Sequence, residues 1–388
     1  MIKNIKLLNK IAKVGTDKLD PKYFNVGEDV DSPFGIMVRS ANMLEMEFNP
    51  ELRAIARAGA GVNNIPIDRC SKEGIVVFNT PGANANGVKE LAIAALMLAS
   101  RNIVGGIEWA KTLEGTEGVA KAVEAGKSKF AGVEIKGKTL GVIGLGAIGG
   151  LVANAAVALG MNVVGCDPFL SVEAAWNIDS SVVKAATFDE VFKVADYVTL
   201  HVPSTPDTKG MINANTLSTM KDGVRIINLA RADLVNSADM KAALESGKMA
   251  AYVTDFPTED VLGVPGVVAI PHLGASTAEA EDNCAVMAAV QLDDYLRYGN
   301  IKNSVNFPNV SMPVVAGHKR ICVLHANVPA VISGITAVLS ETGANIENMI
   351  NKSKGDNAYT LVDFTGELAD GVVEKITAIA GVVRVRVI

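Results

Sequence analysis

The sequence predicts an α/β protein with a doubly wound parallel-sheet cofactor domain, a smaller α/β domain and a separate βαββαβ domain at the end. Three observations support this. Short apolar runs alternate with helical patterns over most of the 388 residues. A glycine-rich turn joins one such run to a helix near the middle of the chain. From residue 318 onward, a shorter strand and helix pattern follows a proline-containing stretch.

The glycine-rich turn is a complete G-x-G-x-x-G that follows the apolar run 139–143. That run is typical of a strand buried on both faces of a parallel sheet. The first glycine allows a tight turn, the second lets a pyrophosphate approach the backbone, and the third lets helix and strand pack closely. The free N–H groups of the helix then face the phosphate. The expected pyrophosphate-binding residues are Gly144, Gly146, Ala147, Ile148 and Gly149.

The second apolar run, 161–165, leads to Asp167. An acidic side chain at this distance from the glycines accepts hydrogen bonds from ribose hydroxyls. It also disfavours the 2′-phosphate of NADP. We therefore expect NAD as the cofactor. A glycine turn alone is weak evidence in a chain with 36 glycines, and a β-turn-α unit without a ligand is the alternative.

Composition narrows the class of protein further. Charged residues make up 20% of the chain and apolar ones 49%, with a net charge of −6 and no block of like charge. Nucleic acid and membrane surfaces are therefore not expected partners. The four cysteines are far apart, so we expect reduced thiols and no metal site. No signal peptide or membrane span is apparent, which predicts a soluble, cytoplasmic protein.

Polar residues follow strand candidates 197–202, 224–229, 251–255 and 267–270. Open α/β sheets bind ligands at the carboxyl ends of their strands. Taken singly, Arg231 reads as a surface ion pair, Glu259 as a solvated loop residue and His272 as a polar turn residue. Beside a nicotinamide, the three together suit hydride transfer coupled to proton transfer. His201 is expected to have a structural or cofactor-edge role.

Residues 1 to about 100 read as a small α/β domain with strand candidates at 5–8, 36–38, 54–56 and 75–78. Two glycine-rich segments, 56–62 and 79–84, either simply turn the chain or present N–H groups to an anion. Arg39 and Arg57 are the nearby cations, and either is alternatively a solvated surface arginine.

Seven segments resemble the D-isomer-specific 2-hydroxyacid dehydrogenases. GKTLGVIGLGAIG, INLARADLV, TDFPTE and PHLGAST match the cofactor domain, and MVRSANM, ARAGAGVNNI and NTPGANANGVKELAIAALM match the substrate domain. The resemblance covers residues 1 to about 310. It implies a substrate domain of residues 1–100 and 285–305 around a cofactor domain of residues 101–284.

The resemblance also implies the site residues. The catalytic residues are Arg231, Glu259 and His272. The cofactor contacts add Asp167, Ala230, Asp255, His272 and Gly274. The substrate contacts are Arg39, Arg57, Ala60, Gly61 and Val62.

Three departures from the family pattern stand out. The usual DVF is shortened to Asp255-Phe256, so the place of Glu259 rests on the PTE match. The proline that normally follows this Glu is Asp260, which makes Asp260 the alternative carboxylate. Val62-Asn63-Asn64 replaces VDN, which removes an acidic group beside the expected anion loop.

Residues 306–317 are expected to be a linker, and residues 318–388 to form a ferredoxin-like βαββαβ domain. Its last strand alternates valines with Arg384 and Arg386. The module resembles ACT domains, which sense amino acids. The resemblance implies that His325, Asn327 and Asn345 bind an amino acid between paired modules. Ala330 stands where the family usually has glycine, which is unfavourable for the expected turn.

A 2-hydroxyacid dehydrogenase followed by one ACT module resembles the branch of the family that oxidises D-3-phosphoglycerate in serine synthesis. The resemblance implies NAD as cofactor, an anionic 2-hydroxy acid as substrate, L-serine as feedback effector and a homo-oligomer, either dimer or tetramer. Two alternatives stay open. One is a glyoxylate or hydroxypyruvate reductase with a regulatory tail, and the other is a non-enzymatic, NAD-sensing corepressor.

Overall fold

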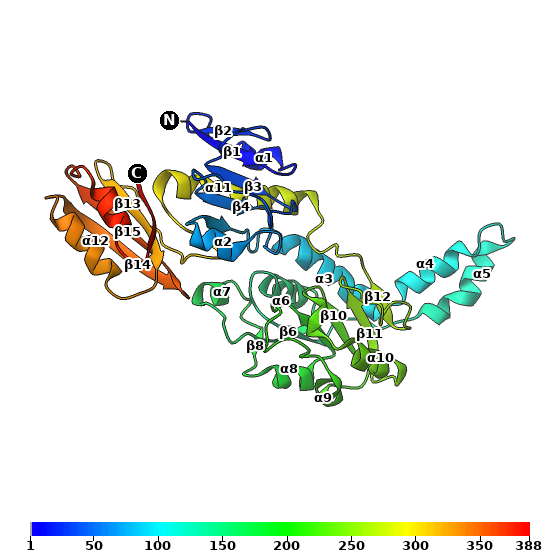
Figure 1. Ribbon diagram of the computed structural model, residues 1–388. Coiled ribbons are helices and arrows are strands. Elements are labelled where there is room, and N and C mark those ends of the chain that lie inside the picture. The colour runs from blue at the N-terminus through cyan, green and yellow to red at the C-terminus, as the bar shows by residue number, and fades with distance from the viewer. Residues whose placement is uncertain (1) are drawn as a thin grey trace. The chain divides into compact units, whose positions relative to one another are not determined.

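The computed structural model describes residues 2–388. Its contacts divide the chain into two compact units, which are described separately below (Figure 1). One unit, here called the cofactor unit, is Ala85–Ala280. The other, here called the composite unit, joins Met1–Asn84 to Glu281–Ile388.

The cofactor unit contains a seven-stranded sheet in the order β12-β11-β10-β9-β6-β7-β8, and every neighbouring pair is parallel. This confirms the predicted doubly wound sheet. Most of these strands are apolar and buried, as a sheet covered on both faces requires. The strands are β6 (Thr139–Ile143), β7 (Asn162–Cys166), β8 (Val183–Lys184), β9 (Tyr197–Leu200), β10 (Val224–Asn228), β11 (Met249–Thr254) and β12 (Val267–Ala269).

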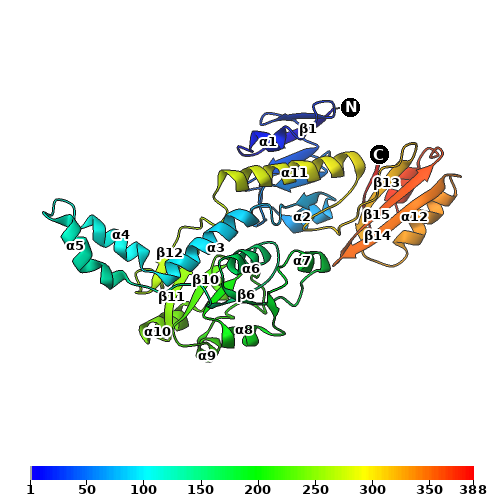
Figure 2. The same ribbon diagram turned by 180° about the vertical axis from the view of Figure 1, so that it is seen from behind.

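Helices cover both faces of this sheet (Figures 1 and 2). Helices α3 (Ala85–Ser100) and α6 (Gly149–Ala158) share one core cluster, in which Leu96 and Val152 pack with Leu140 and Val142. Helices α8 (Phe188–Val194), α9 (Ala214–Thr219) and α10 (Ser237–Glu245) share the cluster on the other face. A short helix, α7 (Val172–Trp176), lies in the connection from β7 to β8.

Helix α3 belongs to the cofactor unit, whereas the sequence placed residues up to 100 in the substrate domain. Its apolar face packs against β10 and β11, which explains its position. The helices that follow, α4 (Ile103–Lys111) and α5 (Val119–Gly126), form a protruding arm, visible in Figure 1, that the sequence did not predict. Within the arm, Trp109 packs against Phe130 at a ring-centroid distance of 5.3 Å.

The composite unit begins with a five-stranded parallel sheet in the order β2-β1-β3-β4-β5. Four of its strands match the predicted ones, and β2 was not predicted. Helix α11 (Ala278–Tyr298) supplies its apolar face to this sheet, with Phe78 and Tyr295 in contact at 5.6 Å between ring centroids. The elements are β1 (Lys3–Leu7), α1 (Lys13–Thr16), β2 (Phe24–Gly27), β3 (Gly35–Val38), β4 (Ala54–Arg57), α2 (Ile67–Lys72) and β5 (Val76–Phe78).

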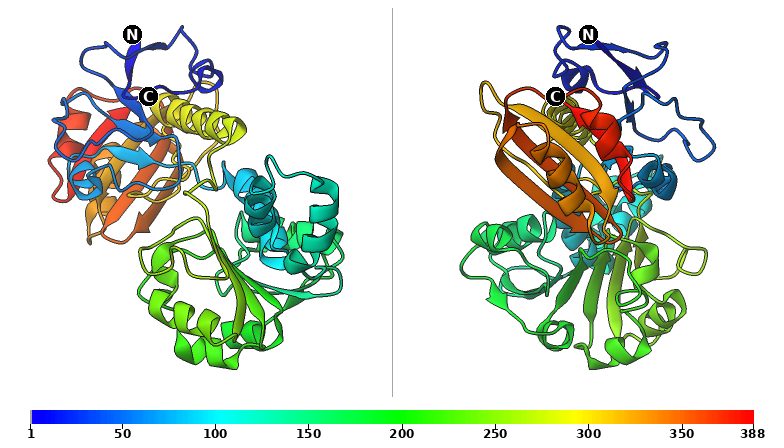
Figure 3. Two further views of the ribbon diagram at one scale, coloured as in Figure 1. Left: turned by 90° about the vertical axis from the view of Figure 1, so that its right-hand side faces the viewer. Right: turned by 60° about the vertical axis from the view of Figure 1, so that its left-hand side comes forward.

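The C-terminal part of the composite unit is a four-stranded antiparallel sheet in the order β14-β15-β13-β16 with two helices on one face (Figure 3). This is the predicted βαββαβ arrangement. The opposite face, through Cys322, Leu324, Tyr359 and Leu361, joins the same core as α11. The elements are β13 (Lys319–Ala326), α12 (Val331–Ser340), β14 (Asn345–Lys354), β15 (Asn357–Thr365), α13 (Val372–Thr377) and β16 (Val382–Val387).

The first part of the segment 306–317, which was expected to be a linker, is packed against the core, whereas residues 313–317 are exposed. Phe307, Val310 and Met312 are buried in the core of the composite unit. Asn306 is also buried: its side chain accepts a hydrogen bond from the Val77 amide and donates one to the Ile75 carbonyl. The C-terminal module is therefore part of one compact body with the first 84 residues.

Within residues 2–388, no single helix is both long and apolar enough to span a membrane. The apolar pair α3 and α4 is bent by 72°, and the buried face of α3 lies in the core described above. Over the same residues, no group of three or more histidine, cysteine or acidic side chains is arranged to hold a metal ion.

Candidate active site

The glycine-rich turn after β6 has the backbone that a dinucleotide site needs. Gly144 has φ +87°, and a Cβ there would lie 2.7 Å from the carbonyl oxygen of His201. A Cβ on Gly149 would overlap the carbonyl oxygen of Gly144, so only glycine allows the helix to start so close to the strand. Gly146 is exposed and faces open space, and Ala147 and Ile148 complete the turn into α6. The turn therefore fits a pyrophosphate at the N-terminus of α6.

Asp167 lies directly after β7, at the carboxyl end of the sheet. One carboxylate oxygen accepts a hydrogen bond from the Leu145 amide at 2.9 Å, and the other accepts one from the Phe169 amide at 2.9 Å. These two bonds fix the side chain and tie the glycine turn to the second strand. Each oxygen keeps a lone pair for a ribose hydroxyl.

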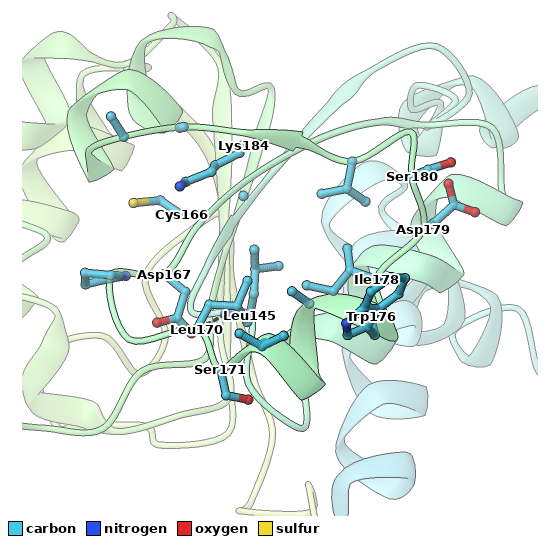
Figure 4. Close-up of a pocket in the computed structure, with 17 residues that line it drawn as sticks. Leu145, Cys166, Asp167, Leu170, Ser171, Trp176, Ile178, Asp179, Ser180 and Lys184 are labelled. Atoms are coloured by element: carbon cyan, nitrogen blue, oxygen red, sulfur yellow. Dashed lines mark hydrogen bonds between the residues drawn. The ribbon is translucent and has the colours of Figure 1, made fainter.

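Asp167 also lines a cavity of about 770 Å³ beside β7 and α7 (Figure 4). Its walls are partly apolar, through Leu145, Leu170 and Ile178, and include the Lys184 side chain and the Cys166 thiol. The volume is within the range of small-molecule sites. Residues of this wall would hold the adenosine half of a dinucleotide.

Asp255, at the end of β11, is 1% exposed. Its Oδ2 accepts a hydrogen bond from the Gly274 amide at 3.1 Å, whereas its buried Oδ1 has no partner. Burial raises the pKa of this carboxyl. An unsatisfied buried acceptor costs free energy unless a ligand donates to it. The amide group of a nicotinamide is such a donor, so Asp255 fits the cofactor end of the site.

Arg231 and His272 both contact the ring of Phe256. The imidazole of His272 lies 4.5 Å from the Phe256 ring, centroid to centroid, and the Arg231 guanidinium carbon is 5.8 Å from the same centroid. Arg231 also donates to the Ala230 carbonyl at 2.6 Å. His272 has φ +47°, an uncommon conformation for a non-glycine residue. Strained residues of this kind cluster at functional sites.

His201 follows β9 and shares a hydrogen bond with the Thr199 hydroxyl at 2.9 Å. Burial lowers the pKa of His201 from its ordinary 6.5 to about 4. The ring is therefore neutral at pH 7, in keeping with a structural role beside the glycine turn.

Comparison with known proteins identifies this part of the chain. Residues 93–274 match the D-isomer specific 2-hydroxyacid dehydrogenase family, NAD binding domain. Those residues are therefore similar to the NAD-binding domain of these dehydrogenases. The glycine turn, Asp167, Arg231, Asp255 and His272 all lie inside the matched span.

Several relatives extend the dehydrogenase match. D-3-phosphoglycerate dehydrogenase of Synechocystis sp. is 34% identical over 325 residues, which are 80% of this chain and 55% of that protein. The Archaeoglobus fulgidus protein of the same name is 37% identical over 288 residues, 71% of this chain and 52% of that one. This chain thus spans about half the length of these relatives. NAD⁺-bound 3-phosphoglycerate dehydrogenase from Entamoeba histolytica is similar in structure, with a TM-score of 0.60 and 25% identity over 79% of this chain and 99% of that one.

The third expected catalytic residue is placed differently from Arg231 and His272. Glu259 is exposed, and so is Asp260. Neither carboxylate forms a hydrogen bond with the His272 ring in the part of the chain that the structure describes, residues 2–388. The loop from Pro257 to Asp260 is held instead by Thr258, whose hydroxyl contacts Ser237 at 3.1 Å.

The expected substrate residues lie in the composite unit. Arg57 ends β4, and its buried Nε has no hydrogen-bond partner. A Cβ at Gly59 would meet the Arg57 side chain, so the guanidinium lies directly over the glycine loop that includes Ala60, Gly61 and Val62. Arg39 is different, because its Nη2 forms an exposed ion pair with Glu281 at 2.6 Å. Arg57 is therefore the better candidate for anion binding.

The expected regulatory residues already have partners within the module. The buried His325 ring donates from Nδ1 to the Ala326 carbonyl at 2.8 Å, and its Nε2 lies 2.9 Å from the Thr360 hydroxyl. Asn327 donates to the Gly355 carbonyl at 3.2 Å, and Asn345 donates to Glu347 at 2.8 Å. Ala330 adopts φ +69°, the conformation that glycine would take without strain.

Sequence reasoning missed Phe256 as a site residue. It was read only as part of a shortened motif, because nothing in a single phenylalanine after a strand shows which side chains it will contact. The aromatic residue directly after Asp255 was the available signal.

Proposed function

We propose that this chain is an NAD-dependent dehydrogenase that oxidises D-3-phosphoglycerate to 3-phosphohydroxypyruvate, the first step of L-serine biosynthesis. The observation that carries the choice of substrate is Arg57, a partly buried guanidinium whose Nε lacks an acceptor beside a glycine loop. A guanidinium without an acceptor suits the phosphate group that distinguishes this substrate from D-glycerate. Relatives with this name, 34–37% identical over 70–80% of the chain, support the same substrate.

The site residues have the chemistry for the oxidation. His272 acts as the general base that takes the proton of the C2 hydroxyl. Arg231 binds the substrate carboxylate and polarises the C2 oxygen, with a planar fork of donors that lysine lacks. NAD, when bound, accepts the hydride from C2. Glu259 is the proposed partner of the second imidazole nitrogen, a bond that forms only when its loop approaches His272.

A steady-state assay of NAD reduction tests this function. The panel is D-3-phosphoglycerate, D-glycerate and D-lactate, with the reverse reaction measured on glyoxylate and hydroxypyruvate. We expect the highest kcat/KM with D-3-phosphoglycerate. A higher value with glyoxylate or hydroxypyruvate would assign the chain to the reductases. NAD binding without turnover of any of these acids would instead indicate a binding protein.

We further propose that the chain works as a homo-oligomer through its α4–α5 arm. Helix α4 has no buried residue, and Ile103, Val104 and Ile107 of α4 and Val119 of α5 are each more than 40% exposed. An arm of this kind gains stability when a second copy covers its apolar side chains. Ile107→Glu should lower the molecular mass found by sedimentation, whereas Val314→Glu, an exposed change in the composite unit, should not. An unchanged molecular mass for Ile107→Glu would exclude the arm as the interface between copies.

Feedback by L-serine is the last part of the proposal. The similarity of the module to amino-acid-sensing domains supports it, and so do the amides of Asn327 and Asn345. Binding has to exchange the internal bonds of these amides for bonds to the ligand. Calorimetry with L-serine on the intact protein and on Asn327→Ala tests this point. We expect a heat of binding with the wild type and none with Asn327→Ala. No heat of binding with the wild type would mean that the module does not bind L-serine.

A further inference from the structure

We propose that Phe256 is a positioning residue whose ring orients the imidazole of His272 and also contacts the guanidinium of Arg231. The contact itself is a property of the cofactor unit. Its effect on turnover rests on the function proposed above.

Two strand ends bring these side chains together. Asp255 and Phe256 directly follow the last residue of β11. His272 comes after the end of β12, which pairs in parallel with β11 through Thr254 and Ala269. The backbone of the histidine is tied to the same place, because its N–H donates to the Asp255 carbonyl at 3.0 Å. The Phe256 amide donates to the Thr254 hydroxyl at 3.0 Å. The phenyl ring and the imidazole are thus fixed by neighbouring strands.

Over residues 2–388 the ring nitrogens of His272 have no hydrogen-bond partner. Glu259 is exposed, and its proposed bond to the imidazole is not formed in this structure. The close neighbour of the ring is Phe256, at 4.5 Å between centroids and 45° between ring planes. Aromatic rings attract each other in tilted arrangements at about this separation. The phenyl ring therefore restricts the directions in which the imidazole can point.

The same ring suits the charge that catalysis creates. A general base that takes a proton becomes an imidazolium, and an aromatic face attracts a cation within about 6 Å of its centroid. Arg231, at 5.8 Å, is also within that distance. Phe256 thus contacts both the base and the carboxylate-binding cation. Loss of the phenyl ring therefore removes a neighbour from both groups at once.

Phe256→Leu and Phe256→Tyr form the matched test. Leucine keeps most of the apolar volume but lacks a ring face, and tyrosine keeps the ring. We expect Phe256→Leu to lower kcat by about tenfold or more, with the KM for NAD changed by less than about threefold. The pH at which kcat reaches half of its plateau should also move. Phe256→Tyr should restore both properties, and Phe188→Leu, which removes a ring elsewhere in the same unit, should change neither.

A proton NMR measurement tests the contact without any substrate. The chain has four histidines, so His272→Gln assigns the imidazole resonances of His272 by difference. The ring current of Phe256 should displace these resonances in the wild type and in Phe256→Tyr, but not in Phe256→Leu. Unchanged resonances in a folded Phe256→Leu protein, or an unchanged kcat, would overturn the proposal. If the wild type oxidised no 2-hydroxy acid, the proposed function would fail while the NMR result still decided the contact.

Discussion

Arg386 contacts Tyr295 in two ways, through the face of its ring and through its backbone carbonyl. The guanidinium carbon of Arg386 lies 4.3 Å from the centroid of the Tyr295 ring, and its Nη2 donates to the Tyr295 carbonyl at 3.0 Å. Tyr295 is in the last turn of α11, and two further cations reach the same helix end. Arg320 donates to the Tyr298 carbonyl at 2.7 Å, and Lys3 donates to the Leu296 carbonyl at 2.8 Å. Cations at a helix C-terminus are favourable because they meet unpaired carbonyls and the negative end of the dipole.

These contacts attach the C-terminal module to the first part of the chain through α11. Arg384 adds bonds to the Leu52 carbonyl at 2.6 Å and to the Glu73 carbonyl, at the end of α2, at 2.7 Å. The composite unit is therefore expected to unfold as one cooperative body.

Replacing Arg386 tests this attachment. Arg386→Met removes a charge-assisted hydrogen bond and a cation–π contact, so the free energy of unfolding should fall by about 3 kcal/mol. Lys375→Met is the control, because Lys375 and Glu341 are both about 60% exposed, and its change should be below about 1 kcal/mol. Urea unfolding gives both values. Equal small losses would mean that the module is only loosely attached.

His201 predicts a pH dependence of stability. Burial lowers the pKa of His201 from its ordinary 6.5 to about 4 in the folded protein, so between these pH values the unfolded chain binds more protons. His201 therefore leaves the free energy of unfolding unchanged above pH 6.5 and lowers it as the pH falls toward 4, by at most about 3 kcal/mol. Urea unfolding of the wild type and of His201→Gln at several pH values measures this. The free energy of unfolding should fall more steeply with decreasing pH in the wild type than in His201→Gln. Parallel plots of this free energy against pH would contradict the prediction.

Asp167 predicts the choice of cofactor. Its carboxylate is held by the Leu145 and Phe169 amides, and a negative charge at this position in the motif disfavours a 2′-phosphate. Asp167→Ala should narrow the preference for NAD over NADP, mainly through the KM for the cofactor. Kinetics with both cofactors check this. A wild type that used both equally well would refute the role given to Asp167.

Arg57 predicts how the phosphate is recognised. Arg57→Met should lower kcat/KM for D-3-phosphoglycerate by about a hundredfold, since a charge-assisted contact to the phosphate is lost. D-glycerate should be affected far less. Arg39→Met is the control, because the Arg39 side chain is already paired with Glu281. Equal losses on both acids would assign Arg57 to folding or to carboxylate binding.

Much of the fold was predictable because the information is local. The strands of the cofactor unit are short apolar runs separated by turns, and the βαββαβ order of the module follows from its own periodicity. Strand β8 escaped prediction because Val183 and Lys184 are only two residues and both are exposed. The arm escaped because α4 has no buried face, and apolar residues such as Ile103 and Ile107 are exposed, so no burial pattern marks the helix.

The packing between distant segments was not predictable. The alternation of Arg384 and Arg386 indicated a polar face of β16, yet this face contacts carbonyls of α2 and α11 that are far away in sequence. The segment 306–317 has the prolines and the lack of periodicity that are typical of a linker. The burial of Phe307 and Met312 therefore could not be read from the sequence. For the site, the motifs predict roles for Asp167, Arg231 and His272. The contact of Phe256 with His272 was not predictable, because it depends on the meeting of two strand ends.

The rate of NAD reduction by the wild type and by His272→Gln, with D-3-phosphoglycerate and its L isomer, tests the central claim most directly. The proposed function requires that the wild type oxidise the D isomer, with His272 as the general base. The variant should then lose about a hundredfold or more in kcat while its affinity for NAD stays nearly unchanged. Near-normal turnover by His272→Gln would remove this histidine from the reaction and contradict the account.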